Sequence, residues 1–246
     1  MIVFENLTKT YRGIRAVDNI NLKVPQGTIF GFIGPNGAGK TTTIKMMAGV
    51  LSPTKGRIFI NGWNIAKDPS EAKRIIGFIP DRPFLYEKLS GVEFLKFKAG
   101  LYRMKEDGLD GKISELLSLF ELTDWAHELI ESYSHGMKQR LIIASAMIHE
   151  PKVIIVDEPM VGLDPKGAKL VKEIFKKCAA QGATVFMSTH TLALAQEICR
   201  QIAIVEKGRI VAKGTPDELK AVAGVEGDLE KIFLKITGGW QENGNL

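Results

Sequence analysis

The chain has 246 residues, of which 45% are hydrophobic and 25% charged, and its formal net charge at pH 7 is +5. These values are ordinary for a globular protein with a sizeable core, and they exclude a disordered or fibrous chain. No apolar run approaches the roughly 18 residues of a membrane-spanning helix, and the start of the chain lacks the layout of a signal peptide. We therefore expect a cytoplasmic protein, whose scattered lysines and arginines favour a solvated surface over a nucleic-acid-binding track.

The N-terminal part of the chain carries strand patterns, and a helical block follows. Residues 2–7, 20–24, 28–33 and 56–62 are alternately or continuously apolar, which predicts strands. From residue 91 to 129 the apolar residues recur at helical spacing, so we interpret this block as a helical insertion.

Beyond the insertion, helices and strands alternate, which predicts a parallel sheet with helices on both faces. Residues 202–206 and 209–212 then flank Lys207-Gly208 as a hairpin, and Thr215 caps a following helix. The alternating elements are a helix over 134–149, a strand over 153–156, a helix over 165–180, a strand over 184–187 and a helix over 192–199.

Two cysteines, Cys178 and Cys199, lie in the helical segments without the spacing of a metal site. We interpret them as buried reduced thiols. The polar, glycine-rich residues 238–246 are expected to fray.

A glycine-rich loop lies between a predicted strand and a predicted helix. Residues 34–41 read Gly-Pro-Asn-Gly-Ala-Gly-Lys-Thr, where the glycines allow consecutive N–H groups to converge on one point and the helix adds its positive dipole end. An anion belongs there, with Lys40 reaching the β- and γ-phosphates and the Thr41 hydroxyl ligating Mg²⁺. The alternative is a glycine-rich turn with an incidental lysine.

Two acids end the apolar run over residues 153–156. In a parallel sheet ligands sit at the carboxyl ends of the strands, so Asp157 would hold Mg²⁺, directly or through water, beside the loop. Glu158 would face the γ-phosphate and orient or activate the attacking water. His190 follows the next parallel strand and would donate a hydrogen bond to the same phosphate. The alternative for the two acids is a solvated strand-to-loop transition, and for His190 a capping residue or a surface side chain.

Ser134 opens a helix and offers a second anion site, made of its hydroxyl, the N–H of Gly136 and a positive dipole end. One nucleotide does not need both this site and the phosphate loop. Two copies of the chain arranged head to tail would use both, because each would present Ser134 to the ATP held by the other.

Taken together, these motifs resemble those of the ATP-binding subunit of ABC transporters, over essentially the whole chain. The motifs that carry the resemblance are the Walker A loop at residues 34–41, the Walker B strand at 153–158, the signature at 133–137, the D-loop at 161–165 and the switch histidine His190.

The resemblance implies ATP and Mg²⁺ as cofactors and assigns further roles. In the family an aromatic residue at the position of Tyr11 stacks on adenine, with Val17 nearby. The ATP contacts within one chain are Tyr11, Val17, Gly34, Pro35, Asn36, Gly37, Ala38, Gly39, Lys40, Thr41 and Thr42. The contacts to the ATP of a second chain are Ser134, His135, Gly136, Met137 and Asp164, the Mg²⁺ ligands are Thr41, Asp81 and Asp157, and the catalytic residues are Glu158 and His190.

The chain departs from the family pattern at two motifs. In the signature, His135 replaces the first glycine and Met137 the glutamine, so we expect function with altered contacts. Asp81 occupies the place of the Q-loop glutamine; a carboxylate is still a Mg²⁺ ligand, directly or through water, but it adds charge. The apolar residues 83–86 that follow form either a small satellite cluster or, as we favour, a groove for a short helix of the membrane subunit.

The expected fold is therefore α/β: a P-loop NTPase core with a mainly parallel sheet, an N-terminal antiparallel β subdomain and an inserted α-helical subdomain. Residues 1–90 and 151–215 would form the core, 91–150 the helical subdomain and 216–246 the C-terminal helices and tail of a single domain.

The resemblance implies an ATPase that dimerises on ATP and drives separate transmembrane permease subunits from the inner face of the cell membrane, with no nucleic-acid partner. The tail over residues 228–238 resembles that of bacterial type-two exporters, which indicates export. The alternatives are a soluble ATPase of the same family acting on nucleic acid or ribosomes, and a regulatory subunit without turnover.

Overall fold

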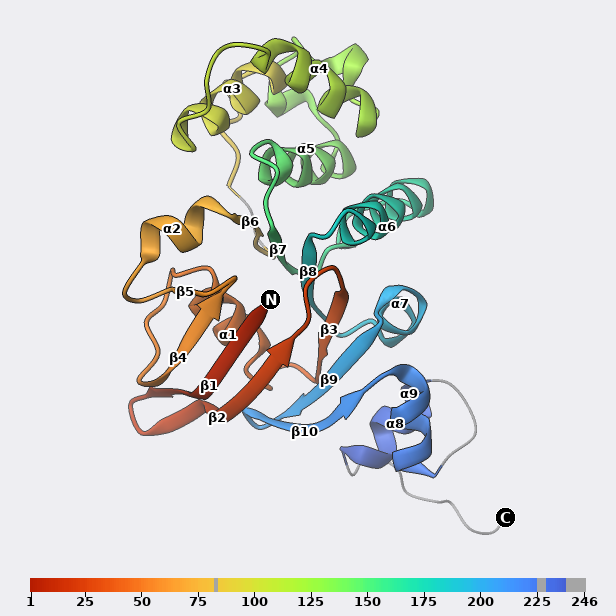
Figure 1. The fold of residues 1–246 in the computed structure, drawn as a ribbon. Helices are drawn as coiled ribbons and strands as arrows, with labels where there is room; N and C mark the ends of the chain where they lie inside the picture. The colour runs from red at the N-terminus through yellow and green to blue at the C-terminus, as the bar shows by residue number, and fades with distance from the viewer. Residues whose placement is uncertain (82–83, 225–228, 238–246) are drawn as a thin grey trace, which may run out of the picture.

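Two β-sheets form the centre of the computed structural model, which describes residues 1–81, 84–224 and 229–237 (Figure 1). The smaller sheet is antiparallel and has the strand order β2-β1-β4-β5. Its strands are β1 (Ile2–Tyr11), β2 (Ile14–Val24), β4 (Lys55–Ile60) and β5 (Trp63–Asn64).

The larger sheet has six strands in the order β10-β9-β3-β8-β7-β6, all parallel to their neighbours except β10. Its parallel strands therefore end at one edge of the sheet, where ligands bind in such folds. The two sheets confirm the predicted fold class. The strands are β3 (Ile29–Ile33), β6 (Ile76–Ile79), β7 (Val153–Asp157), β8 (Thr184–Thr189), β9 (Gln201–Glu206) and β10 (Arg209–Gly214).

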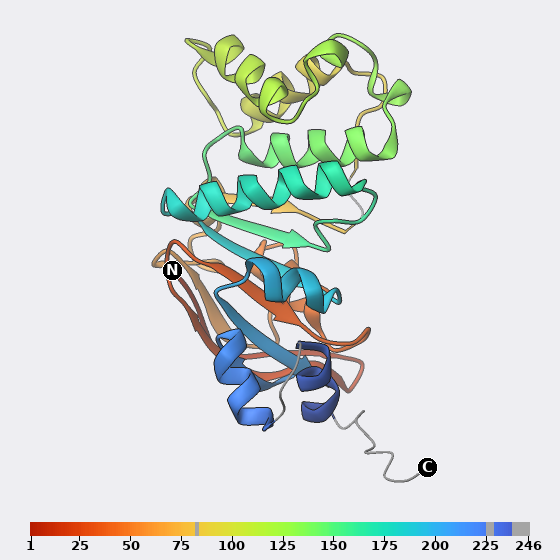
Figure 2. The same cartoon turned by 90° about the vertical axis from the view of Figure 1, so that its right-hand side faces the viewer.

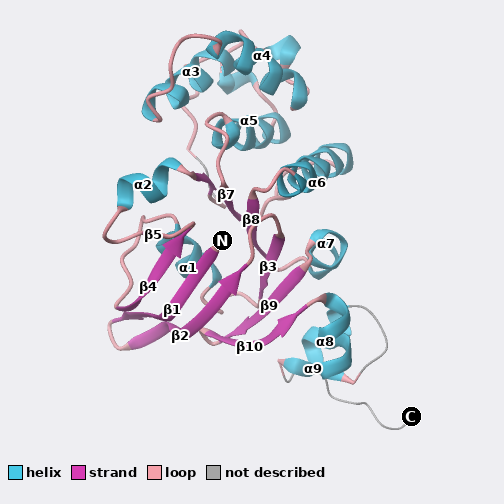
Figure 3. Ribbon diagram, viewed as in Figure 1, coloured by secondary structure: helices cyan, strands magenta, loops and turns pink. Residues whose placement is uncertain are grey.

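Three helices form a lobe at the end of the molecule away from the antiparallel sheet (Figures 1 and 3). They are α3 (Gly91–Leu101), α4 (Leu109–Leu119) and α5 (His135–Met147). The view in Figure 2 shows that α5, the helix of the lobe nearest the larger sheet, runs beside α6 (Pro165–Ala180), which lies between the lobe and that sheet. The other helices are α1 (Lys40–Met47), α2 (Pro69–Arg74), α7 (Leu192–Ile198), α8 (Pro216–Ala223) and α9 (Leu229–Ile236).

The core consists of two clusters of buried apolar residues on opposite faces of the larger sheet. Between the sheets, the ring of Phe186 packs against Phe4, Phe30 and Phe32 at centroid distances of 6.1, 5.5 and 5.4 Å. Such aromatic contacts bury large areas in favourable geometry, and they fix the antiparallel sheet against the strands that carry the site.

Most predicted elements match, and the differences have physical causes. β1 extends to Tyr11 and β2 begins at Ile14, so both are longer than expected. Most of their additional residues are polar or exposed, with only Val17 buried, so this hairpin lacks the apolar alternation that indicates a buried strand. The predicted C-terminal hairpin is confirmed, with Lys207 and Gly208 at φ 47° and 79°, the two left-handed residues of a type I′ turn.

The two cysteines differ from each other. Cys199 is buried as expected, and burial raises the pKa of its thiol to about 12. Cys178 is only half-buried, although it packs against the core cluster from the last turn of α6. The expectation of a buried thiol was therefore wrong for Cys178. The expected frayed residues 238–246 lie outside the described residues.

Candidate nucleotide-binding site

The phosphate loop joins β3 to α1, and neighbouring backbone crowds two of its glycines. A Cβ on Gly34 would lie 2.2 Å from the carbonyl oxygen of Val205, and one on Gly39 would lie 2.2 Å from that of Ala16. Gly39 also has φ 100° and precedes the first residue of α1. Only glycine fits these positions, so the loop turns directly onto the N-terminus of a helix, whose first N–H groups have no partner within it.

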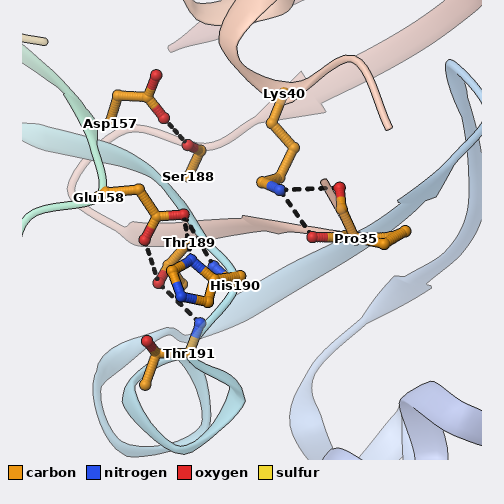
Figure 4. Close-up of polar contacts among 9 residues, drawn as sticks. Pro35, Lys40, Asp157, Glu158, Ser188, Thr189, His190 and Thr191 are labelled. Atoms are coloured by element: carbon orange, nitrogen blue, oxygen red, sulfur yellow. Dashed lines mark hydrogen bonds and ion pairs between the residues drawn. The ribbon is translucent and has the colours of Figure 1, made fainter. Parts of the chain in front are cut away.

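Lys40 is buried against this loop. Its Nζ donates hydrogen bonds to the carbonyl oxygens of Gly34, at 2.7 Å, and Pro35, at 3.1 Å (Figure 4). Burial lowers the pKa of Lys40, while the charges of Glu158 and Asp157 act in the opposite direction. The ammonium group is thus held beside two carboxylates at the ends of the parallel strands.

Asp157 ends β7 and is buried next to β8. The two strands pair in register at Asp157 and Ser188, and the Ser188 hydroxyl donates a hydrogen bond to Asp157 Oδ1. This contact fixes one carboxylate oxygen and leaves the group facing the cleft that Thr41 also lines. Hydroxyl and carboxylate oxygens are the protein ligands that Mg²⁺ prefers, so the donor set fits this ion.

Glu158 has a left-handed backbone, with φ 52°, a conformation that costs a non-glycine residue roughly 1–3 kcal/mol. Its N–H donates to Ser188 O at 3.0 Å, and its carboxylate accepts hydrogen bonds from the Thr189 hydroxyl at 3.2 Å and from the N–H of His190 at 3.1 Å. His190 Nδ1 lies 2.8 Å from Glu158 Oε1 (Figure 4). Four contacts to the strand exit of β8 therefore hold a strained acid in place.

These residues line one cleft of about 350 Å³. It brings together most residues expected to bind ATP and Mg²⁺. It adds Ala16, which precedes Val17, and Val161, the first residue of the D-loop, neither of which was expected to contact the nucleotide. Two further residues of the loop, Gly34 and Ala38, are buried and do not line the cleft. The lining residues are Ala16, Asn36, Gly37, Gly39, Lys40, Thr41, Thr42, Asp81, Asp157, Glu158, Val161 and His190.

Two expected adenine contacts do not lie in this cleft. Val17 is fully buried in the core, so its side chain is not available to a base. Tyr11 ends β1 with its ring 44% exposed, and Lys9 Nζ lies 5.2 Å from the ring centroid. The placement of Val17 corrects the expectation, while adenine stacking by Tyr11 stays a prediction.

The signature residues and Asp164 of the D-loop do not line the cleft either. Ser134 is exposed and caps α5 by accepting a hydrogen bond from Met137 N at 3.3 Å. Asp164 caps α6 in the same way through Gly167 N at 2.8 Å. His135 lies against the D-loop, where a Cβ on Gly162 would be 2.0 Å from its Cδ2. The two motifs thus contact each other within the chain and present a shared outer surface.

Asp81 links the cleft to a second hollow, an apolar groove of about 810 Å³ beside α5. Phe84 is 77% exposed at this groove and packs edge-on against Tyr86, with centroids 5.2 Å apart. Pro83, part of the expected apolar segment, lies outside the described residues. The groove is lined by Asp81, Phe84, Leu85, Tyr86, Glu87, Lys88, Leu89, His135, Lys138, Gln139 and Ile142.

A phosphate loop at a strand-to-helix turn, a buried lysine and two acids at the ends of parallel strands define a P-loop ATPase cassette. The family profile described as "ABC transporter" matches residues 17–161. Among curated proteins, the uncharacterized ABC transporter ATP-binding protein YhcH of Bacillus subtilis is 41% identical, over 86% of this chain and 68% of its own length. The daunorubicin/doxorubicin resistance ATP-binding protein DrrA of Streptomyces peucetius is 36% identical, over 89% of this chain and 66% of its own.

Solved structures show the same relationship. The structure of an ATP-binding subunit of an ABC transporter superposes with a TM-score of 0.91 at 34% identity, covering 96% of this chain and 99% of that one. A dimeric post-hydrolysis state of the ATP-binding cassette MJ0796, bound to ADP and Pi, gives 0.79 at 28% identity, covering 87% and 98%. The chain belongs to the ABC transporter family of ATP-binding proteins. Within its described residues, no helix combines the length and apolar character needed to cross a membrane.

Proposed function

We propose that the chain hydrolyses ATP with Mg²⁺ as one of two cassettes in a head-to-tail dimer, and that this cycle drives export through separate permease subunits. The observation that carries the proposal is the fixed position of the Glu158 carboxylate in the same cleft as Lys40 and Asp157. Phosphoryl transfer asks mainly for positioning and charge stabilisation, and this cleft supplies both.

Different residues of the cleft would bind the phosphates and Mg²⁺. The loop N–H groups and Lys40 bind the phosphates, with Lys40 exchanging its contacts to the Gly34 and Pro35 carbonyl oxygens for phosphate oxygens. Thr41 and Asp157 would hold Mg²⁺, which supplies charge neutralisation between the β- and γ-phosphates. Asp81 would be a further ligand, directly or through water.

Glu158 accepts a proton from the attacking water as it orients that water toward the γ-phosphate. His190 lies against the same carboxylate and is placed to turn its other ring nitrogen toward the phosphate. The strained backbone of Glu158 supports this role, since strain of this kind clusters at functional sites.

The signature surface requires a partner in this proposal. Ser134 and the N-terminus of α5 are exposed and outside the cleft of their own chain, so they serve the ATP of a second copy. The dimeric form of the related cassette MJ0796 supports such an arrangement. The drug-resistance function named for DrrA supports export.

The apolar groove would receive a short helix of the permease. Phe84 and Tyr86 offer exposed aromatic surface there, as grooves that accept amphipathic helices do. Because Asp81 lines both the groove and the cleft, movement of the loop around it would connect the permease with the nucleotide.

Phosphate release from Mg-ATP by the purified chain tests the enzymatic part. Lys40→Ala should abolish release, while Lys45→Ala, an exposed lysine on the same helix, serves as the matched control. Equal rates in wild type and Lys40→Ala would contradict the site. Co-purification with a membrane protein encoded nearby tests the transport part, and stimulation by DNA or ribosomes instead would contradict it.

A further inference from the structure

A pocket between α2 and the C-terminal end of α3 is lined by four positively charged side chains. Lys73, Arg74 and Arg103 are exposed, and Lys98 is half-buried. This cationic pocket has a volume of about 390 Å³ and lies apart from both the nucleotide cleft and the apolar groove. No carboxylate is among the described residues that line it. The lining residues are Ser70, Lys73, Arg74, Lys98, Leu101, Tyr102 and Arg103.

The pocket has a fixed wall. The Tyr102 hydroxyl donates a hydrogen bond to the carbonyl oxygen of Ile76 at 3.2 Å, and its ring is stacked on His149 with centroids 3.6 Å apart. The stem of Lys73 lies over Gly49, where an added Cβ would come within 2.8 Å of its Cε. These contacts keep the wall in place whether or not a ligand binds.

The positive charges of the pocket are poorly compensated. Lys98 is half-buried, and within the described residues its ammonium group makes no hydrogen bond or ion pair. Burial lowers the pKa of Lys98, and its charge also lowers the pKa of His149. Arg74 reaches Glu71 only at 3.5 Å between exposed side chains, a contact of little value. Within the described residues, Arg74 is the only cation lining the pocket that has a carboxylate partner, so a bound anion would supply the missing counter-charge.

We propose that this pocket binds the phosphate group of an anionic phospholipid. A phosphate group is attracted by the four cations, and Leu101, 62% exposed, provides an apolar rim beside them at the C-terminal end of α3. Cationic and apolar side chains side by side are typical of surfaces that lie against a membrane. A free phosphate ion would use the cations but not the apolar rim.

Vesicle flotation of the full chain tests this assignment, with ADP in excess so that the phosphate loop is occupied. The chain should float with phosphatidylcholine vesicles that contain about one third phosphatidylglycerol, and not with pure phosphatidylcholine. The double variant Lys98→Gln/Arg103→Gln should bind the anionic vesicles roughly 25-fold less, because each cation near an anionic surface contributes about fivefold. The single variant Arg103→Gln, at an exposed position, should bind about fivefold less.

The matched control is Lys169→Gln/Lys207→Gln, which removes two exposed cations elsewhere and should bind within about twofold of wild type. Equal loss in both double variants, or no flotation of wild type, would overturn the proposal. A rise in Tm with inorganic phosphate, lost in Lys98→Gln/Arg103→Gln but without vesicle binding, would assign the pocket to free phosphate instead. Unchanged ADP binding by all variants shows that they are folded and keeps this outcome separate from that of ATP hydrolysis.

Discussion

The nucleotide cleft and the signature surface lie on the same chain but are built in opposite ways. In the cleft, the polar groups contact one another: Lys40 reaches loop carbonyl oxygens, and Glu158 is held by the exit of β8. On the signature surface, Ser134 and Asp164 cap helices and otherwise face outward. In the proposed dimer, one half of the ATPase site is thus preorganised within the chain, whereas the other half would be presented to a partner.

The sharpest test of the preorganised half is Glu158→Gln. The amide keeps the size of the side chain but accepts no proton, so kcat should fall by about 10²-fold or more, while ATP still binds. With hydrolysis blocked, dimers should accumulate in Mg-ATP. Phosphate release and light scattering on a sizing column measure the two effects.

Glu115→Gln is the control for this change, because Glu115 is an exposed acid on α4. It should leave both turnover and dimerisation unaltered. Normal turnover in Glu158→Gln would remove Glu158 from its proposed role.

Ser134→Ala addresses the partner-facing half. In a head-to-tail dimer, Ser134 of one subunit and Lys40 of the other belong to the same site. Mixed dimers that carry Ser134→Ala and Lys40→Ala on different subunits should therefore keep one intact site, whereas dimers with both changes on one subunit should lose both. We expect a difference of roughly tenfold in phosphate release, and the reverse ranking would refute the shared site. Thermal unfolding controls for the lost helix cap, worth about 1 kcal/mol.

The sequence predicted features that depend on local spacing better than features that depend on packing between distant segments. The phosphate loop and the acids at residues 157 and 158 were recognisable because their chemistry depends on local spacing along the chain. The burial of Val17 was not, because it depends on how the antiparallel sheet packs on the larger one. The cationic pocket was equally hidden, since α2 and α3 bring together residues from positions 70 to 103 that are unremarkable in sequence.

The contact between His135 and Gly162 within one chain can be tested separately. Gly162→Ala should lower turnover roughly tenfold, because the new Cβ would lie 2.0 Å from His135 Cδ2 and displace the signature from the D-loop. Combining it with His135→Gly should restore part of the loss. The remainder reflects the φ of 81° at Gly162, which strains any side chain. Strictly additive effects on phosphate release would show that the two residues do not act through this contact.

The smallest predicted effect concerns His149, which lies between α5, the helix that begins after the signature Ser134, and β7, the strand that ends at Asp157. Its Nε2 lies 3.0 Å from the carbonyl oxygen of Ile76, and its buried Nδ1 has no hydrogen-bond partner within the described residues. Burial, with the nearby charges of Lys98 and Lys112, lowers the pKa of His149 to about 4, against the effect of the hydrogen bond to Ile76. The folded protein therefore contains the neutral ring over most of the acidic range.

Because the pKa of His149 is about 4 when folded and 6.5 ordinarily, the unfolded chain binds more protons between these values. The free energy of unfolding should consequently decrease as the pH falls from 6.5 towards 4. In His149→Gln, whose amide donates to the same carbonyl oxygen without titrating, this decrease should be smaller. Denaturant unfolding at pH 7 and pH 5 measures it, with the exposed His127→Gln as control. An identical pH dependence in wild type and His149→Gln would mean that the junction between α5 and β7 admits the charged ring, and that it is less tightly closed than its contacts indicate.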